Sequence, residues 1–476
     1  MQQVECRVCG TSNYGKIVFC TKCRSRLPSD VEHINQTEKA NGFHAVRTLI
    51  SRPSIMYVRP ILLVITILVG IALLFRLAGF EVSEPIFESE VPTSMSPTYD
   101  TGWRNIHRDS KHSGFTQTDV SITEPVVQWS FATNPDQLPD QFTAPIVSDG
   151  IIYTGTYSGK LMALDLRSGA VVWEVTTGSP IDSAPAMNES KVMVASREGT
   201  IYCLNRTTGS VHWKYSTDSP IYAPLTVHKE WVFAGGLDGH IYALDIETGD
   251  QLWRYGGSGS LVSGIAVDGN VVVASYNDNY LRVLDRNEGK FRFKYFNTAG
   301  NEGTSIADGK IYLAGRDGKV RAIDSSEKEA FYDKIVRWSQ VQSFAWGWRD
   351  TVPHQRGYIW SYHLPSSKFI GFPAIKGNRL FAVAMEGDMI SLGRQQGHEK
   401  WSFKAGGPKI RFTTSPVLLG DWVVAGDSEG TLYWFDQETG EIVLKQNYGP
   451  DPLINIVFAE GVLLINSSNG NLSGSY

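Results

Sequence analysis

Short apolar runs separated by turn residues recur along the chain from about residue 144 onward, with a period near 40 residues. Three consecutive units read APIVSDGIIYTGTYSGKLMALDLRSGAVVWEV, APAMNESKVMVASREGTIYCLNRTTGSVHWKY and APLTVHKEWVFAGGLDGHIYALDIETGDQLWRY. Each unit contains four runs rich in β-branched and aromatic residues, which is the pattern of four short strands. One such sheet cannot bury both of its faces alone, so we expect the units to stack into the blades of a β-propeller.

The number of blades follows from one turn position that recurs in every unit. It falls at Gly159, Gly199, Gly239, Asn279, Gly318, Gly387, Gly430 and Gly470. The intervals are 40, 40, 40, 39, 69, 43 and 40 residues, so there are eight units and the fifth carries an insert, which we place at residues 325–356. The sequence therefore predicts an all-β fold, an eight-bladed β-propeller over residues 103–476.

A second spacing fixes the register inside each unit: an Asp or Asn, a Gly four residues later, and a Trp four residues after that. The carboxylate or amide can accept backbone N–H groups of a turn, and the Gly allows a positive φ. We expect the Trp to open the fourth strand and to cover the neighbouring blade. The glycines are Gly169, Gly209, Gly249, Gly397 and Gly440, and the tryptophans are Trp173, Trp213, Trp253 and Trp401.

Closure of the ring can also be predicted. The run VVQWSF at residues 126–131 has the character of a fourth strand, yet it precedes the first unit. The last unit contains only three strands before Tyr476. We therefore expect residues 126–131 to complete the eighth blade, which would leave few free sheet edges between the first and last blades.

The chain before the repeats contains a candidate membrane span. Residues 60–80 read PILLVITILVGIALLFRLAGF, 21 residues with Arg76 as the one charge, and a helix of this length spans ~31 Å. Basic residues precede it and glutamates follow it, which places the N-terminus in the cytoplasm. We therefore predict a single-pass protein of the cell membrane with a cytosolic linker (31–59), an extended extracytoplasmic stalk (81–102) and an extracytoplasmic propeller.

Four of the five cysteines lie at the N-terminus, as Cys6, Cys9, Cys20 and Cys23. Two C-x-x-C pairs at this spacing can place four thiolates around one Zn²⁺ ion, and residues 4–27 resemble the zinc-ribbon family. We predict a zinc ribbon over residues 1–30. A closed shell of four thiolates leaves no open position, so this zinc would be structural rather than catalytic.

Charge excludes one broad class of function. The chain has 44 Lys and Arg residues against 49 Asp and Glu residues, a formal net charge of −5. This balance excludes a globally basic nucleic-acid binder. The charge is unevenly spread, because residues 1–60 hold nine basic and four acidic residues, and such asymmetry is typical of segments in different environments.

The repeats resemble the pyrroloquinoline-quinone (PQQ) repeat family of β-propellers. Residues Ala243 to Trp253 match every position of its A-x-D-x-x-T-G-x-x-x-W signature. The segment from Trp103 to Gly114 looks like the W-x-x-x-x-x-D-x-x-H-S/T-G lead-in of secreted members. In the family's dehydrogenases, a Trp, a vicinal disulfide and a calcium ion accompany the quinone. This chain has no Cys-Cys dipeptide, Cys203 is single, and no nucleophile elbow or P-loop is present, which argues against bound PQQ and against an enzyme.

The insert is unusually aromatic. It contains Phe331, Tyr332, Trp338, Phe344, Trp346 and Trp348. One interpretation is that these side chains pack onto the side of the ring. The other is that Trp338, Phe344, Trp346 and Trp348 form a platform for a partner protein or a sugar. A rim of turn residues on the opposite face, including Tyr157, Asp182, Arg197 and Tyr222, is the second candidate surface.

Together these features favour a non-catalytic, membrane-anchored scaffold of the bacterial envelope that binds protein partners. The resemblance implies an analogy to the family's lipoprotein that assists outer-membrane barrel assembly, at the level of the fold alone. Two alternatives stay open: an extracytoplasmic sensor or glycan or small-molecule binder that uses the funnel of the propeller, and a degenerate PQQ-dependent oxidoreductase.

Overall fold

A computed structural model describes residues 3–5, 12–14, 102–116, 125–132, 140–297, 303–329, 333–348, 353–404 and 411–475. The chain divides into two compact units, Met1–Ser94 and Met95–Tyr476. In the first unit, β1 (Gln3–Glu5) and β2 (Ser12–Tyr14) form an antiparallel hairpin. The four N-terminal cysteines and the expected membrane helix at residues 60–80 lie outside the described residues. In the described part of the chain, no helix has the length and apolar character needed to cross a membrane.

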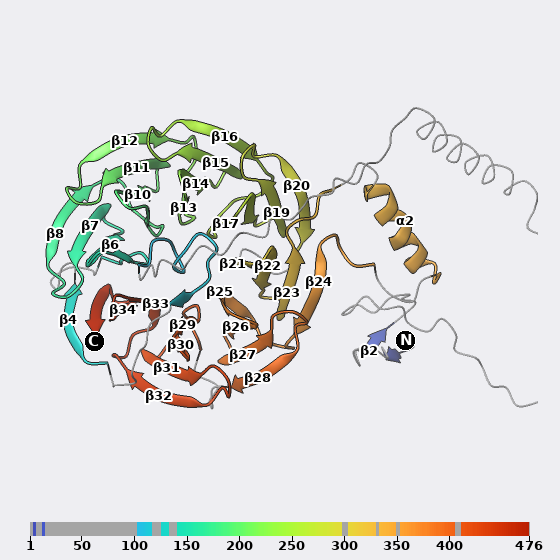
Figure 1. The fold of residues 1–476 in the computed structure, drawn as a ribbon. Helices are drawn as coiled ribbons and strands as arrows, with labels where there is room; N and C mark the ends of the chain where they lie inside the picture. Colours follow the sequence, from blue (N-terminus) through green and yellow to red (C-terminus); the bar gives the residue numbers. More distant parts are fainter. Residues whose placement is uncertain are drawn as a thin grey trace, which may run out of the picture. The chain divides into compact units, whose positions relative to one another are not determined.

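The second unit is a ring of eight antiparallel sheets, which confirms the predicted eight-bladed propeller (Figure 1). Blades 1 to 4 consist of β5–β8, β9–β12, β13–β16 and β17–β20, and blades 5 to 7 of β21–β24, β25–β28 and β29–β32. Blade 8 combines β33, β34 and β35 from the end of the chain with β4 from before the first blade. The short strand β3 (Phe115–Thr116) pairs in parallel with β29.

The strands are short and evenly spaced. Blades 1 to 4 contain β5 (Ile146–Ser148), β6 (Ile151–Gly155), β7 (Lys160–Asp165), β8 (Val171–Thr176), β9 (Ala186–Met187), β10 (Lys191–Ala195), β11 (Thr200–Asn205), β12 (Val211–Ser216), β13 (Thr226–His228), β14 (Trp231–Gly235), β15 (His240–Asp245), β16 (Gln251–Gly256), β17 (Ala266–Asp268), β18 (Val271–Ser275), β19 (Tyr280–Asp285) and β20 (Phe291–Phe296). Blades 5 to 8 contain β21 (Thr304–Ala307), β22 (Lys310–Ala314), β23 (Lys319–Asp324), β24 (Tyr358–His363), β25 (Phe369–Lys376), β26 (Arg379–Ala384), β27 (Asp388–Gly393), β28 (Glu399–Lys404), β29 (Val417–Leu419), β30 (Trp422–Gly426), β31 (Thr431–Asp436), β32 (Ile442–Asn447), β33 (Leu453–Ala459), β34 (Val462–Ser467), β35 (Asn471–Ser475) and β4 (Val127–Ala132).

Burial within a blade explains why its strands differ in sequence. The second and third strands, such as β10 and β11, are buried on both faces against neighbouring blades and read as continuous apolar runs. The fourth strand, such as β8, alternates between exposed and half-buried residues because it lies at the outer edge of the ring. The core is therefore a series of apolar layers between blades.

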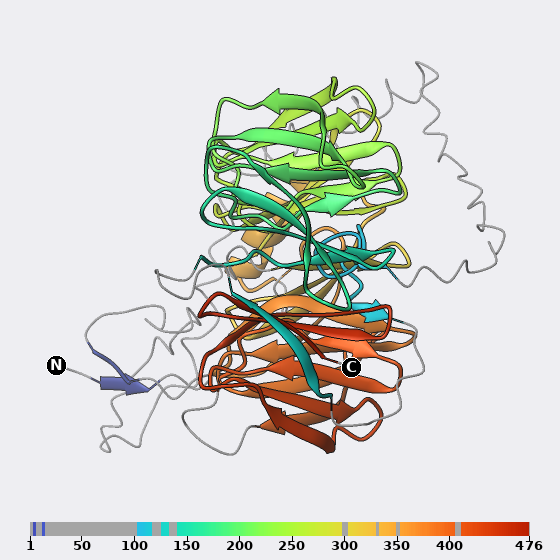
Figure 2. The same ribbon diagram turned by 90° about the vertical axis from the view of Figure 1, so that its left-hand side faces the viewer.

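The closure of the ring is confirmed, with a shift of one residue. The closing strand is β4, Val127–Ala132 rather than residues 126–131, and it pairs antiparallel with β35 so that Trp129 lies opposite Gly474. In Figure 2, β4 is the teal strand beside the red strands of the C-terminus. Pairing the two ends of the repeat region in one sheet joins the first and last blades.

The signature Trp and Gly of neighbouring blades contact each other. The Trp is the third residue of the fourth strand rather than its first, and its ring covers the Gly turn of the next blade, where an added Cβ would lie within 3 Å of the ring. Its indole N–H also donates to a carbonyl of that blade, as from Trp173 to Arg206 at 2.9 Å. The Trp–Gly pairs are Trp129–Gly169, Trp173–Gly209, Trp213–Gly249, Trp253–Gly289, Trp360–Gly397 and Trp401–Gly440.

The lead-in, residues 103–116, runs along the inner edges of all eight blades, in blue at the centre of the ring in Figure 1. Trp103 exchanges backbone hydrogen bonds of 2.6 and 2.8 Å with Val147 of blade 1. The other contacts, in order of blades 2 to 8, join Arg104 to Met187, Asn105 to Val227, Ser110 to Val267, Lys111 to Ile306, Ser113 to Ile375, Gly114 to Leu418 and Thr116 to Phe458. These partners are 40, 40, 40, 39, 69, 43 and 40 residues apart, the intervals of the repeat itself.

Two buried histidines hold the lead-in in place. His107 Nδ1 lies 2.8 Å from the carbonyl oxygen of His112, and its Nε2 lies 3.0 Å from that of Pro416 in blade 7. His112 Nδ1 lies 2.9 Å from the carbonyl oxygen of Thr304 in blade 5. Burial lowers the pKa of His107 and lowers that of His112 to about 4, so the His112 ring is neutral near pH 7. Gly114 has φ +64°, and a Cβ there would lie 2.2 Å from the His107 ring.

Candidate functional site

The insert lies between β23 and β24 of blade 5, and it contains a helix that the sequence analysis did not predict. Helix α2 (Asp333–Ala345) projects from the outer side of the ring near β20 and β24 (Figure 1). Asp333 places a carboxylate in its first turn, which suits the positive end of the helix dipole. The helix ends at Ala345, and Gly347, two residues later, has a φ of +74° and donates its N–H to the carbonyl of Phe344.

The base of the insert is fixed to two blades. Arg356, just before β24, forms ion pairs with Asp333 of α2 and with Glu327. The Gln355 side chain accepts from the backbone N–H of Phe296 in β20 at 2.6 Å and donates to its carbonyl at 2.8 Å. The insert is therefore attached at its base while α2 lies further out.

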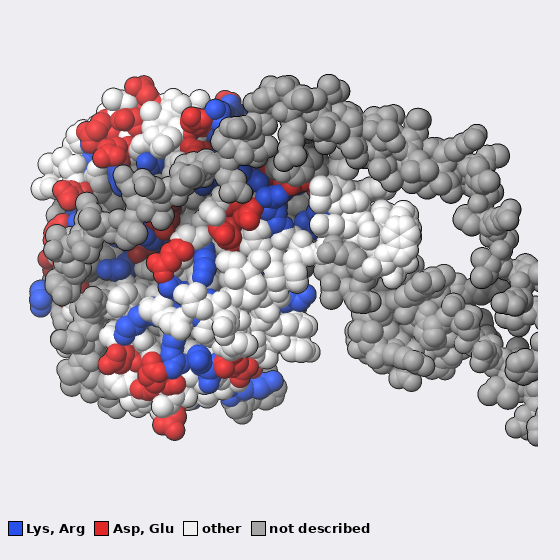
Figure 3. Space-filling view, turned by 45° about the vertical axis from the view of Figure 1, so that its right-hand side comes forward, with Lys and Arg blue, Asp and Glu red and all other residues white. Residues whose placement is uncertain are grey.

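Helix α2 has the reverse of the usual amphipathic orientation. Asp333 and Arg337, one turn apart, line a cavity on the side of the ring. Ile335, Trp338 and Val341 are exposed, at 66%, 62% and 42%. A surface helix normally buries its apolar stripe, so these side chains are uncovered in this unit of the chain. Figure 3 shows few charged side chains on the part of the surface that projects at the insert.

The residues after the helix extend this apolar surface. Trp346 and Trp348 are 58% and 74% exposed, and their rings form a T-shaped pair with centroids 4.9 Å apart. Phe344 is 36% exposed. The four predicted partner-binding residues are thus all on the surface rather than packed into the core. Phe331 and Tyr332 lie outside the described residues.

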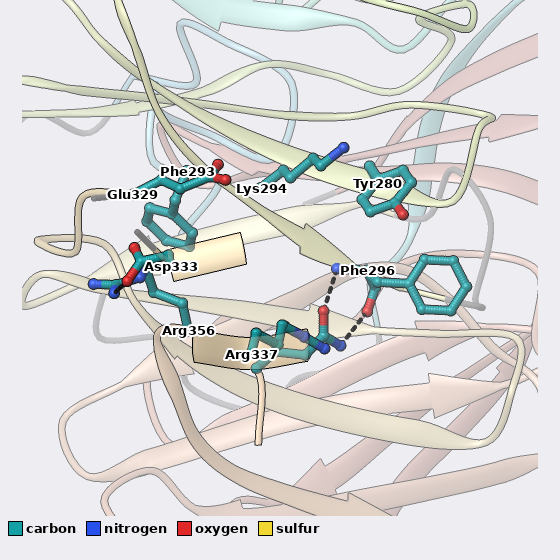
Figure 4. Close-up of a pocket in the computed structure, with 9 residues that line it drawn as sticks. Tyr280, Phe293, Lys294, Phe296, Glu329, Asp333, Arg337 and Arg356 are labelled. Atoms are coloured by element: carbon teal, nitrogen blue, oxygen red, sulfur yellow. Dashed lines mark hydrogen bonds and ion pairs between the residues drawn. The ribbon is translucent and has the colours of Figure 1, made fainter. Parts of the chain in front are cut away.

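A cavity of about 410 Å³ lies between the insert and blade 4 (Figure 4). On the blade side, the Lys294 ammonium lies 4.3 Å from the centroid of the Tyr280 ring. The sequence interpretation missed this cavity and the helix beside it. The i, i+3, i+6 spacing of Ile335, Trp338 and Val341 is the one signal that could have indicated the helix. The lining residues are Tyr280, Phe293, Lys294, Phe296, Glu329, Asp333, Arg337, Gln355 and Arg356.

The rim residues also come together, on blades 1 and 2. The Arg197 guanidinium makes two hydrogen bonds, of 2.7 and 2.6 Å, to the carboxylate of Asp182. Its central carbon lies 5.7 Å from the ring centroids of both Tyr157 and Tyr222. This cluster confirms that these loops lie on one face of the ring. Its two charged groups, Arg197 and Asp182, are already paired with each other.

The described residues contain no pair of adjacent cysteines of the kind that the family's dehydrogenases place against the quinone. Cys203 is the one described cysteine; it is free, buried in β11, and burial raises the pKa of its thiol to about 12. The lead-in occupies the inner edges of the blades. No cluster of His, Cys, Asp or Glu able to hold a metal ion is present among the described residues. The zinc ligands predicted from the sequence lie outside them.

Comparison with known proteins places these observations in a family. A family model described as outer membrane protein assembly factor BamB matches residues 87–182, 167–343 and 355–470. Outer membrane protein assembly factor BamB of Yersinia pestis is 44% identical over 57 residues, which are 12% of this chain and 14% of that protein. The protein of the same name from Marinobacter adhaerens is 29% identical over 118 residues, 24% of this chain and 29% of the relative. These matches thus span a small part of the curated relatives.

Solved structures share the fold. The crystal structure of BamB from Moraxella catarrhalis superposes with a TM-score of 0.56 at 18% identity, covering 74% of this chain and 98% of that one. Quinohemoprotein alcohol dehydrogenase from Comamonas testosteroni gives a TM-score of 0.59 at 14% identity, covering 79% and 80%. Because an outer membrane protein assembly factor and a dehydrogenase share this ring, the fold alone does not decide between their functions.

Proposed function

The chain belongs to the family of the outer membrane protein assembly factor BamB, and from that premise we propose that it is a non-catalytic scaffold of the bacterial envelope. In this proposal the propeller stays rigid and presents the surface of α2 and the two tryptophans after it to a protein partner. The observation that carries the proposal is the uncovered apolar surface formed by α2, with Trp338 at 62% exposure, and by the residues after it, with Trp348 at 74%.

Physical chemistry favours this surface over the rest of the ring. Exposed Trp side chains lose solvent-exposed apolar area when a partner covers them, and Trp is enriched among residues that dominate binding energy. The Arg197 cluster on the rim offers less, because its carboxylate and guanidinium already satisfy each other. The funnel of the propeller is the weaker candidate for ligand binding, since the lead-in bonds to the innermost strand of every blade.

The proposed scaffold is anchored by a single membrane helix at residues 60–80, with a zinc ribbon held by the four N-terminal cysteines in the cytoplasm. Apolar length and flanking charge support the helix, and ligand spacing supports the ribbon. Protease added to intact spheroplasts should release the propeller and spare the ribbon. Metal analysis should give about one zinc per chain. A protected propeller, or a chain free of zinc, would contradict these two parts.

The scaffold function is tested by partner capture. After crosslinking in membranes, the chain carrying Trp346→Ala and Trp348→Ala should recover far less of any protein that the wild type captures, since losing one such anchor costs about 2 kcal/mol or more. Tyr157→Ala is the matched control, because Tyr157 is an exposed aromatic residue on the rim, at 43%. Equal capture by the wild type and the double variant, with loss in Tyr157→Ala, would move the docking surface to the rim.

A further inference from the structure

The cavity under α2 lies against an open strand edge. Strand β20 is the outer strand of blade 4, and the insert reaches it at two points: Glu329 N–H donates to Arg292 O at 2.6 Å, and Gln355 bonds both backbone groups of Phe296. The insert thus makes, at both ends of β20, hydrogen bonds that a neighbouring strand would make. Lys294, midway between these points, lines the cavity.

The backbone of Lys294 faces the same edge. In an antiparallel ladder, alternate residues direct N–H and C=O to the same side. Phe296 lies opposite Tyr280 of β19 and points its backbone groups outward to Gln355; Lys294, two residues earlier and opposite Arg282, therefore points its own outward too. No residue in the described part of the chain forms a hydrogen bond with the backbone N–H or C=O of Lys294. An extended peptide could bond to these groups and so continue the sheet beyond β20.

The charged side chains that line the cavity indicate which charge a bound peptide would carry. Asp333 and Glu327 share one cation, Arg356. Lys294 and Arg337 have no carboxylate partner among the described residues, whereas Glu329 is the one lining carboxylate without a cation there. With Glu327 counted, these described charges sum to zero, so it is the two unpaired cations rather than a net charge that would attract a carboxylate. Figure 4 shows Lys294 beside Tyr280 on the blade side and Arg337 on the insert side. The Phe293 ring, buried at 1% exposure, supplies an apolar wall.

We propose that this cavity binds an extended, acidic segment of a partner protein, which adds to β20 as a further strand. Its backbone would pair with Lys294, its carboxylates would lie near Lys294 and Arg337, and its alternate apolar side chains would face the aromatic wall. This inference rests on the proposed scaffold function and names the kind of segment that the scaffold receives. The Gln355 side chain occupies the backbone groups of Phe296, to which a longer bound peptide would otherwise bond.

Fluorescence polarisation with the full chain in detergent tests the proposal. The probe is a short labelled peptide that alternates valine and glutamate. It should bind saturably, and a valine–lysine peptide and a valine–glutamate peptide with N-methyl groups on alternate residues should bind about tenfold more weakly. Equal binding of the N-methylated peptide would overturn strand addition, and equal binding of the lysine peptide would overturn the charge selection. Absence of saturable binding would overturn both.

Variants locate the site. Arg337→Glu should weaken binding of the valine–glutamate peptide about tenfold. Lys214→Glu is the matched control, because Lys214 lies two repeats earlier, in β12, with its ammonium 4.9 Å from the Tyr202 ring and no insert beside it; it should bind as the wild type does. Gln355→Ala should tighten binding by freeing the Phe296 backbone. Unchanged binding in Arg337→Glu, or weaker binding in Gln355→Ala with intact circular dichroism, would overturn the proposal.

The outcome is independent of the test of the scaffold function. The chain with Trp346→Ala and Trp348→Ala keeps the β20 edge, Lys294 and Arg337, so it should bind the peptide as the wild type does. Peptide binding without partner capture would therefore contradict only the aromatic docking surface. Partner capture without peptide binding would contradict only this inference.

Discussion

The lead-in at residues 103–116 and the insert at residues 325–356 are two segments of the propeller unit that do not follow the repeat, and they use their side chains in opposite ways. The lead-in buries Trp103 and two histidines and bonds to all eight blades, to six through its backbone and to blades 3 and 8 through the side chains of Asn105 and Thr116. The insert attaches to the ring through a few polar contacts and leaves Trp346 and Trp348 exposed. The first arrangement stabilises the ring, and the second leaves apolar surface available for binding.

The largest expected effect separates tryptophans in these two kinds of environment. Trp360 is 7% exposed, covers Gly397 of the next blade and donates its indole N–H to Arg394 O at 2.9 Å. Trp360→Ala should lower the free energy of unfolding by about 4 kcal/mol. Trp348→Ala, at 74% exposure, should change it by less than about 0.5 kcal/mol. Urea unfolding of the two variants measures the difference, and similar losses would mean that the insert belongs to the core.

The next effect tests the packing of the lead-in. Gly114→Ala introduces a Cβ 2.2 Å from the His107 ring at a backbone φ of +64°, so it should cost about 3 kcal/mol or more. Gly150→Ala is the control, since Gly150 has φ +73° and no atom within 4 Å of an added Cβ. It should cost only the backbone term, about 1 kcal/mol. If urea unfolding gives the same loss of unfolding free energy for both variants, the His107 ring does not pack against Gly114.

Acidification should destabilise the packing of the lead-in. Burial lowers the folded-state pKa of His112 to about 4, below the ordinary value of 6.5. Between these values the unfolded chain binds a proton that the folded chain does not, so stability falls as pH falls through this window. For His112 the loss should be about 2 kcal/mol between pH 7.5 and pH 5. The thermal midpoint of His112→Asn should depend less steeply on pH than that of the wild type. Identical slopes of midpoint against pH would contradict the assignment of this effect to His112.

The repeat was readable from the sequence because each blade needs the same turn chemistry. Asp165 accepts the backbone N–H of Ser168 at 2.8 Å, and Gly169 has φ +69°, as the Asp–Gly spacing predicts. Counting the other recurring turn, which begins with Gly159 and ends with Gly470, indicated eight blades, and the Trp in residues 126–131 indicated the closing strand. The aromatic residues of the insert also indicated a surface, because a turn between two strands does not need them.

The path of the lead-in and the cavity under α2 could not be predicted in the same way. The lead-in binds mostly through backbone groups, which every sequence carries, so its course depends on where the eight inner strand edges lie. The cavity depends on two contacts between distant residues, Gln355 with Phe296 and Glu329 with Arg292. Neither contact corresponds to a recognisable residue spacing in the sequence. Helix α2 itself is indicated only by a short apolar stripe.

The contrast between the two segments is tested most directly by removing the insert. Residues 326–355 are deleted and bridged by a short glycine turn, and the variant and the wild type are compared in thermal unfolding and in crosslinked partner capture from membranes. The account predicts an unchanged thermal midpoint, because the lead-in and all eight blades remain, together with loss of the captured partner. A deleted chain that captures the same partner at the wild-type level, or that no longer folds, would contradict it.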